Sequence, residues 1–127
     1  MVKTEITLIN ALDVEYARDG YIKTQDIRNI TVNAIVDKGP ASLVITEELR
    51  KKLGLGIKEE AIARLANGQR VKSQLTDEVG IRWKDREWGI QAMVIPGAEE
   101  VFLSIQQDEV DFFVMDLLEN VQVGIKS

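Results

Sequence analysis

The sequence predicts a mostly-β domain, a barrel or a sandwich, with one short helix. Many short segments alternate apolar and polar residues with a period of two, which is typical of half-buried strands. Asn-Gly and Asp-Gly pairs lie between such segments, as expected for hairpin turns. The 127 residues are enough for one domain with a substantial core, so we expect one domain over 1–127.

The first part of the chain is expected to hold two strands separated by a polar excursion. Residues 4–12 alternate and are rich in β-branched side chains, which favours a strand. Residues 13–26 are polar and include the turn pair Asp19-Gly20, so an excursion or a loose hairpin is expected. Residues 30–36 form the next predicted strand, with the even-numbered apolar positions on one face.

A short strand at 43–45 is expected to lead into the single predicted helix. Thr46 is a favourable N-cap, acidic residues occupy the first turn and basic residues occupy the last turn. Gly54 is a typical C-terminal stop. The helix is therefore predicted over 47–53.

The second half of the chain is expected to consist mainly of hairpins. Asn67-Gly68 marks the tip of a tight turn between two alternating segments. The strands predicted here are 60–65, 71–75, 77–83, 87–95 and 101–105. Beyond them we expect a helical turn at 106–110 and strands at 112–115 and 121–125.

Composition limits the chemistry that this chain can perform. Cysteine and histidine are both absent, which excludes disulfides, thiol nucleophiles and Ser-His-Asp mechanisms. We expect no metal and no cofactor. The net charge of −5 argues against nucleic-acid binding, and no apolar run approaches the ~20 residues of a membrane span. The N-terminus has no charged-then-apolar leader, so a cytoplasmic location is the default expectation.

The candidate catalytic residue is Asp37. The stretch 32–45 is an apolar strand that runs into Asp37, turns at Gly39 and continues as a second apolar strand. A carboxylate at the end of a buried strand is expected either to have hydrogen-bond or ion-pair partners or to take part in function, because burying an unpaired charge costs free energy. In a chain without Cys or His, carboxylates are also the leading candidates for general acid–base catalysis.

Four stretches resemble the retropepsin-like aspartic peptidases, in particular their small bacterial branch. The stretch 34–45, AIVDKGPASLVI, resembles that branch's apolar-apolar-Asp-Thr-Gly-Ala pattern, and a helix ending in Gly54-Leu55 follows it. Leu65-Ala66-Asn67-Gly68 resembles the flap hairpin. The stretch 94–103 resembles the strand before the second apolar-apolar-Gly signature, and 108–116 resembles the closing helix and strand. The resemblance covers the chain from about Glu5 to its end.

This resemblance implies a closed acid-protease barrel with one short α-helix after the Asp loop. It implies a homodimer in which each chain contributes one Asp37. The two carboxylates would share a proton, because like charges about 3 Å apart cannot both ionise. Gly39 would allow a close approach to the backbone. The hairpin tip, Ala66, Asn67 and Gly68, would close over an extended peptide or protein substrate.

Three residues depart from the family's pattern at this site. Lys38 replaces the Thr whose hydroxyl bonds across the two-fold axis, and two buried ammonium groups would need the Asp37 carboxylates as partners. Pro40 replaces a small residue and lacks an N–H. Ser104 stands where the second signature has Gly, and its Cβ is expected to obstruct the loop behind Asp37. The interpretation is a preserved fold with altered chemistry.

Functions of different classes therefore stay open. The first is an endopeptidase that acts as a homodimer through the Asp37 pair. The second is a non-catalytic peptide-binding or dimerisation module on the same fold, in which Lys38 keeps both carboxylates ionised. A third is a monomeric β-domain that lost its two-fold pairing together with the Thr.

Overall fold

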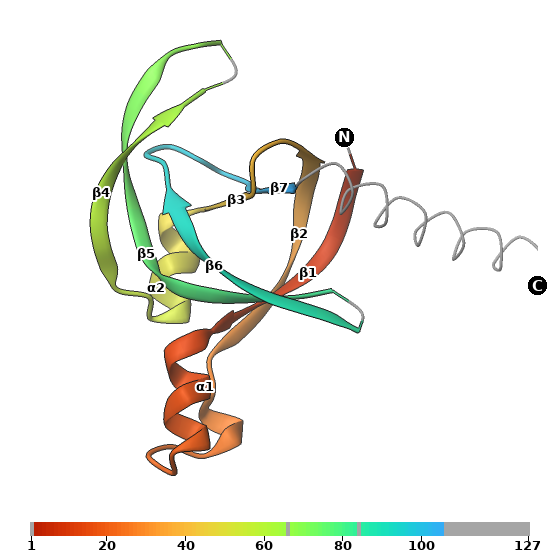
Figure 1. The fold of residues 1–127 in the computed structure, drawn as a ribbon, viewed down its shortest axis with the longest axis vertical. Helices are drawn as coiled ribbons and strands as arrows, with labels where there is room; N and C mark the ends of the chain where they lie inside the picture. Colours follow the sequence, from red (N-terminus) through yellow and green to blue (C-terminus); the bar gives the residue numbers. More distant parts are fainter. Residues whose placement is uncertain (1, 66, 84, 106–127) are drawn as a thin grey trace, which may run out of the picture.

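The computed structural model describes residues 2–65, 67–83 and 85–105 and is mostly β (Figure 1). The elements are β1 (Val2–Asn10), α1 (Ala11–Arg18), η1 (Thr24–Asp26), β2 (Asn29–Lys38), β3 (Ser42–Ile45), α2 (Glu47–Leu53), β4 (Ile57–Arg64), β5 (Arg70–Trp83), β6 (Arg86–Val94) and β7 (Val101–Ile105). The elements predicted at 106–110, 112–115 and 121–125 lie outside the described residues. Among the described helices, none is long and apolar enough to span a membrane.

The strands form one sheet that closes into a barrel. Their order is β1-β2-β7-β3-β6-β5-β4, and β1 also pairs with β5. The closing contact is antiparallel and joins Thr7 to Arg82 and Asn10 to Val79. Six strands therefore make the barrel, while β4 extends the sheet outside it through its pairing with β5. The predicted mostly-β barrel is confirmed.

Alternation of side chains determines which residues fill the barrel. In β2, Ala34 and Val36 are buried, and in β7 the odd-numbered positions from Val101 to Ile105 are buried. In the β5–β6 hairpin, the core face carries Val79, Ile81, Trp83, Ala92 and Val94, with Trp88 and Ile90 packed against it. The apolar faces predicted from the period-two pattern are confirmed.

The helix α2 has the ends that the sequence predicts. The Thr46 hydroxyl accepts a hydrogen bond from the Leu49 N–H at 3.1 Å, and Gly54 adopts a left-handed φ of 66°. The helix covers Glu47–Leu53, so the predicted 47–53 is confirmed.

The expectation of one helix is wrong, because the polar excursion begins with a second one. β1 ends at Asn10, and α1 follows directly where the sequence had predicted strand up to 12 and then a loop. The Asn10 side chain accepts from the Asp13 N–H at 3.0 Å and so caps α1. Asn10 is the last residue of the strand as well as the helix cap, and the strand pattern masked the cap.

Polar contacts of the buried Asn10 and Asp13 hold the excursion in place. Arg28 donates from Nε (2.8 Å) and Nη2 (2.9 Å) to the two carboxylate oxygens of Asp13. Asn10 donates from Nδ2 to the carbonyl of Leu53 at 2.8 Å, which ties the start of α1 to the end of α2. The helix α1 projects from the end of the barrel opposite to the β2–β3 turn (Figure 1).

The hairpins differ from the prediction in one respect. The strands predicted at 71–75 and 77–83 are a single strand, β5, with a register shift between Leu75 and Glu78. The buried Thr76 hydroxyl fills the irregularity by accepting from the Ala92 N–H at 3.1 Å. This continuity makes β5 long enough to pair with β4, β6 and β1 in turn.

Candidate active site

Asp37 is exposed and lies at the end of β2, one residue before the strand stops. Its neighbours Ala34 and Val36 point into the core, so alternation places Asp37 on the outer face of the barrel. One carboxylate oxygen, Oδ1, accepts a hydrogen bond from the backbone N–H of Lys38 at 2.8 Å. The acid is therefore held by its own loop and presented to solvent within one chain.

Strand pairing places Asp37 in a row with two serines. Asp37 is the register partner of Ser104 in the parallel β2–β7 ladder. Ser104 is in turn the partner of Ser42 in the antiparallel β3–β7 ladder. Register partners in adjacent strands point to the same face of a sheet, so the three polar side chains share the outer face.

Gly39 turns the chain beside this row without strain. Its N–H donates to the carbonyl of Ile105 at 3.1 Å, and it is not among the glycines with positive φ. A Cβ placed at Gly39 would lie 3.6 Å from Ser104 Cβ and 3.8 Å from Ser104 Oγ. These are ordinary van der Waals distances, so the obstruction expected from Ser104 is not found.

Lys38 and Pro40 are both exposed in the single chain. Lys38 pairs in register with Ile105, so its side chain leaves the strand on the face opposite to Asp37. Within residues 2–65, 67–83 and 85–105, neither Asp37 nor Lys38 takes part in an ion pair. Pro40 lies two residues beyond Lys38, the last residue of β2, so its missing N–H removes no bond from the ladder.

An apolar cleft of ≈ 640 Å³ lies next to the row. Its lining includes Val44, Ile62, Leu65, Met93, Ile95 and Phe102, together with Ser42 and Ser104. The residues come from the outer faces of β3, β6 and β7 and from the overhanging β4–β5 hairpin. Asp37 itself is not a lining residue, but its register partner is, so the carboxylate borders the cleft.

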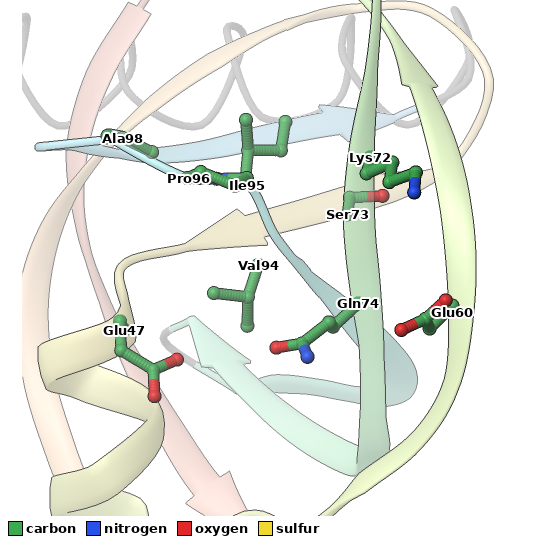
Figure 2. A pocket seen from close by; sticks show the side chains of 10 residues that line it. Glu47, Glu60, Lys72, Ser73, Gln74, Val94, Ile95, Pro96 and Ala98 are labelled. Atoms are coloured by element: carbon green, nitrogen blue, oxygen red, sulfur yellow. The ribbon is translucent and has the colours of Figure 1, made fainter.

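A second cavity of ≈ 380 Å³ shares residues 95–98 with this cleft. Figure 2 shows Val94 and Gln74 in its interior, with Glu47 of α2 and Glu60 of β4 at opposite sides. A third hollow of ≈ 520 Å³ is lined by Gly97, Glu99, Glu100 and Phe102. The loop 95–98 is a wall of the first two hollows, and Gly97 lines all three.

Glu47 is a poor candidate for an acid in this second cavity. Arg50 Nε donates to its Oε2 at 2.8 Å. This side-chain hydrogen bond lowers the pKa of Glu47, against the opposing effect of desolvation. Glu47 therefore acts as an ionised acceptor.

The β4–β5 hairpin closes as the sequence predicts. The Gly68 N–H donates to the Leu65 carbonyl at 2.9 Å, and the Leu65 N–H donates to the Gln69 carbonyl at 2.8 Å. Gly68 has a φ of 85°, and Asn67 Oδ1 accepts from the Gln69 N–H at 2.9 Å. Of the three predicted flap residues, Asn67 and Gly68 form this turn, and Ala66 lies outside the described residues.

Comparison with protein families identifies the family of this chain. A family model described as "Aspartyl protease" matches residues 24–120, which include Asp37, the β4–β5 hairpin and β7. The chain belongs to the aspartyl protease family.

One solved structure from the same class of proteins is similar to this chain. It is the crystal structure of a retropepsin-like aspartic protease from Rickettsia conorii, with 17% identity and a TM-score of 0.36. The match covers 81% of this chain and 76% of that chain. No curated protein matches the chain.

The described residues of this site comprise the carboxylate of Asp37, the cleft of ≈ 640 Å³ and the β4–β5 hairpin beside the cleft. Among the described residues, no group of three His, Cys, Asp or Glu side chains is placed to hold a metal ion. Sequence reasoning missed Ser42 and the cleft residues Ile62, Met93 and Phe102. The alternation of apolar and polar positions in β3 and β7 places Ser42 and Phe102 on the outer face, and this pattern could have identified them as residues near the site.

Proposed function

We propose that the protein is a retropepsin-like endopeptidase that acts as a homodimer with one Asp37 from each chain. The observation that carries the proposal is the position of Asp37, which is exposed on the outer face beside an apolar cleft of ≈ 640 Å³. A hydrogen bond from its own loop orients the carboxylate. These are the requirements of an acid that must meet a substrate and a second carboxylate.

The proposed reaction is the hydrolysis of a peptide bond without a covalent intermediate. One Asp37 carboxylate accepts a proton from water, which attacks the carbonyl carbon, while the protonated partner carboxyl donates to the carbonyl oxygen. Collapse of the tetrahedral intermediate breaks the C–N bond: the carboxyl that took the proton from water gives it to the leaving nitrogen, and the other carboxylate takes up a proton from one diol hydroxyl as the product carboxyl group forms. The two carboxylates then hold one proton between them again.

Gly39 supports the involvement of a second copy or a substrate. Within the chain, neither its φ nor the space around its Cα requires a glycine. A glycine at such a position is useful where another backbone approaches closely. The approaching group is therefore outside the described chain, as expected at a two-fold axis or along an extended peptide.

The proposed substrate is an extended peptide that lies in the cleft beneath the β4–β5 hairpin. The cleft walls are largely apolar, which favours apolar side chains near the scissile bond. We expect neither nucleic acid nor a membrane as a partner. The proposal also retains the cytoplasmic location, which cell fractionation would test.

Lys38 favours a second candidate, a non-catalytic dimer that binds peptides. Lys38 follows Asp37 in the chain, its side chain is exposed, and it has no ion-pair partner among the described residues. In a two-fold pair it could meet the other chain's Asp37 and keep both carboxylates ionised. A dyad without its shared proton would bind peptides in the cleft but would not protonate the carbonyl.

The decisive experiment measures cleavage of an unstructured protein by the full chain at mildly acidic pH. The peptidase proposal predicts cleavage that is lost in Asp37→Asn and blocked by a statine-type inhibitor. Asp26→Asn is the matched control, because Asp26 is exposed on η1 and remote from β3 and β7. Absence of cleavage over a broad pH range, by a protein shown to be dimeric in sedimentation, would reject the proposal.

The same variants test the binding alternative. If the protein only binds peptides, Asp37→Asn should leave peptide affinity nearly unchanged in calorimetry, and wild type should cleave nothing. A large loss of affinity in Asp37→Asn would count against that alternative.

A further inference from the structure

The row of Asp37, Ser104 and Ser42 crosses three hydrogen-bonded strands. Asp37 and Ser104 are register partners in β2 and β7, and Ser104 and Ser42 are register partners in β7 and β3. Both serines are half-buried, and both line the apolar cleft. The row therefore links the acid to the cleft by polar side chains on one face.

The polar groups of this row have unused hydrogen-bonding capacity. Oδ1 of Asp37 accepts from the Lys38 N–H. Within the described part of the chain, neither serine hydroxyl forms a hydrogen bond, and none reaches Oδ2 of Asp37. Each hydroxyl can therefore donate one hydrogen bond, and the Asp37 carboxylate is the charged acceptor of the row.

The three residues that follow Asp37 have no backbone N–H left for Oδ2, since Gly39 donates its own to the carbonyl of Ile105. Lys38 already contributes its backbone N–H. Pro40 has no N–H and Ala41 has no polar side chain. On the outer face, the register partner of Asp37 is Ser104, whose hydroxyl can donate.

The distances within the row allow the bond. Adjacent strands lie about 4.7–4.9 Å apart, and a serine hydroxyl and a carboxylate on register partners can bridge this spacing. A change of staggered χ1 rotamer is enough to redirect the Ser104 hydroxyl. Ser42, on the other side of Ser104, can then donate to the Ser104 oxygen, which keeps one lone pair free.

We propose that Ser104 is a positioning residue that donates a hydrogen bond to Oδ2 of Asp37, supported by Ser42. The proposal rests on the proposed peptidase function. It assigns the hydroxyl a role that Gly at this position could not have. With both oxygens held, the carboxylate plane is fixed against the cleft, and the ionised form that activates water is stabilised by a charge-assisted bond.

The first test is structural and needs no activity. A crystal structure of the wild-type protein at high resolution should place Ser104 Oγ about 2.5–2.7 Å from Oδ2 of Asp37, the usual length of such a bond. A Ser104 hydroxyl directed at solvent or at a backbone carbonyl overturns the proposal. This result is independent of whether the protein cleaves anything.

The second test is kinetic and uses Ser104→Ala with Ser104→Thr as the conservative variant. We expect kcat to fall about tenfold in Ser104→Ala with KM unchanged, because substrate binding does not use the hydroxyl. Ser104→Thr should restore most of the rate, and Ser42→Ala should cause a smaller loss. Thr31→Ala is the control, since Thr31 is exposed at the other end of β2, the strand that carries Asp37.

The outcomes separate this inference from the proposed function. An unchanged kcat in Ser104→Ala, with cleavage by the wild type, overturns the positioning role and leaves the peptidase intact. A raised KM with unchanged kcat also overturns it, because that result assigns Ser104 to substrate binding. If the wild type cleaves nothing, the peptidase proposal fails and the crystal structure alone decides the role of Ser104.

Discussion

The carboxylate of Asp37 is held by the main chain of Lys38, whose N–H donates to Oδ1 at 2.8 Å. Any residue except proline supplies this bond. The Lys38 side chain leaves the strand on the opposite face and is exposed. A substitution at position 38 other than proline therefore keeps the hydrogen bond to Asp37, so its effects can be assigned to the side chain.

Replacing Lys38 with Thr is expected to strengthen the proposed dimer and to raise the proposed peptidase activity. Two ammonium groups about 4 Å apart near a protein surface repel by about 4 kcal/mol before other charges compensate. Removing both should raise dimer affinity and kcat/KM at least tenfold. Sedimentation and peptide cleavage measure the two effects, with Lys23→Thr, a change at an exposed site on the excursion, as the control.

Other outcomes of Lys38→Thr would show what surrounds the Lys38 ammonium group in the assembly. If Lys38→Thr weakens the dimer, the ammonium groups must be paired in the assembly. If neither affinity nor activity changes, Lys38 is solvated in the dimer as it is in the single chain.

Replacing Gly39 with Ala should leave the fold intact and impair only the assembled site. A Cβ at this position meets Ser104 at 3.6 Å, and Gly39 has no positive φ, so the chain tolerates it. The melting temperature of the protein at low concentration should stay within about 2 °C of wild type. Dimer affinity or kcat/KM should fall if a second backbone approaches Gly39, and an unimpaired enzyme would show that nothing does.

The sequence predicted the strands well because alternation is a local signal. Val36, Asp37 and the turn at Gly39 could be placed without tertiary information. The helix α1 was missed because Asn10 completes the strand alternation and also caps the helix. Its anchor, the ion pair of Asp13 with Arg28, depends on a fold that brings the two ends of the excursion together.

The site was predictable only as far as its local part. Asp37 and the hairpin turn at Gly68 follow from short motifs. The row with Ser104 and Ser42 depends on the register of one parallel and one antiparallel ladder. Register between strands far apart in sequence is set by the closed barrel, and no short motif encodes it.

Removing the Asp13 carboxylate is expected to destabilise the excursion. Asp13 has a side chain only 6% exposed, whereas that of Arg28 is 51% exposed and can be solvated again. The loss in Asp13→Ala should therefore be moderate, roughly 1–3 kcal/mol of unfolding free energy. Chemical denaturation measures it, with Glu15→Ala on the exposed face of the same helix as the control.

The pH dependence of this contribution follows from the direction of the pKa shift. The side-chain hydrogen bond from Arg28 lowers the pKa of Asp13 below its ordinary value, although desolvation opposes the change. The unfolded state therefore takes up the proton first as pH falls, from about pH 4 downwards. The stability gap between wild type and Asp13→Ala should be constant at neutral pH and shrink below that point. A gap that widens on acidification would contradict this account.

Alanine substitutions at three glycines with similar left-handed φ can separate effects on stability from effects on peptide binding. Gly20, Gly68 and Gly97 have φ values of 83°, 85° and 80°, and no atom lies within 4 Å of a Cβ built on any of them. Ala at each position should therefore lower the unfolding free energy by about 1 kcal/mol, the penalty of a left-handed L-residue.

The three glycines differ in their position relative to the cleft. Gly20 lies in the excursion, whereas Gly68 is at the tip of the β4–β5 hairpin and Gly97 lines all three hollows. Only Gly68→Ala and Gly97→Ala should weaken peptide binding in calorimetry, while all three should lower the melting temperature by a similar amount. A matching loss of binding in Gly20→Ala would show that peptide affinity follows global stability and not the shape of the cleft.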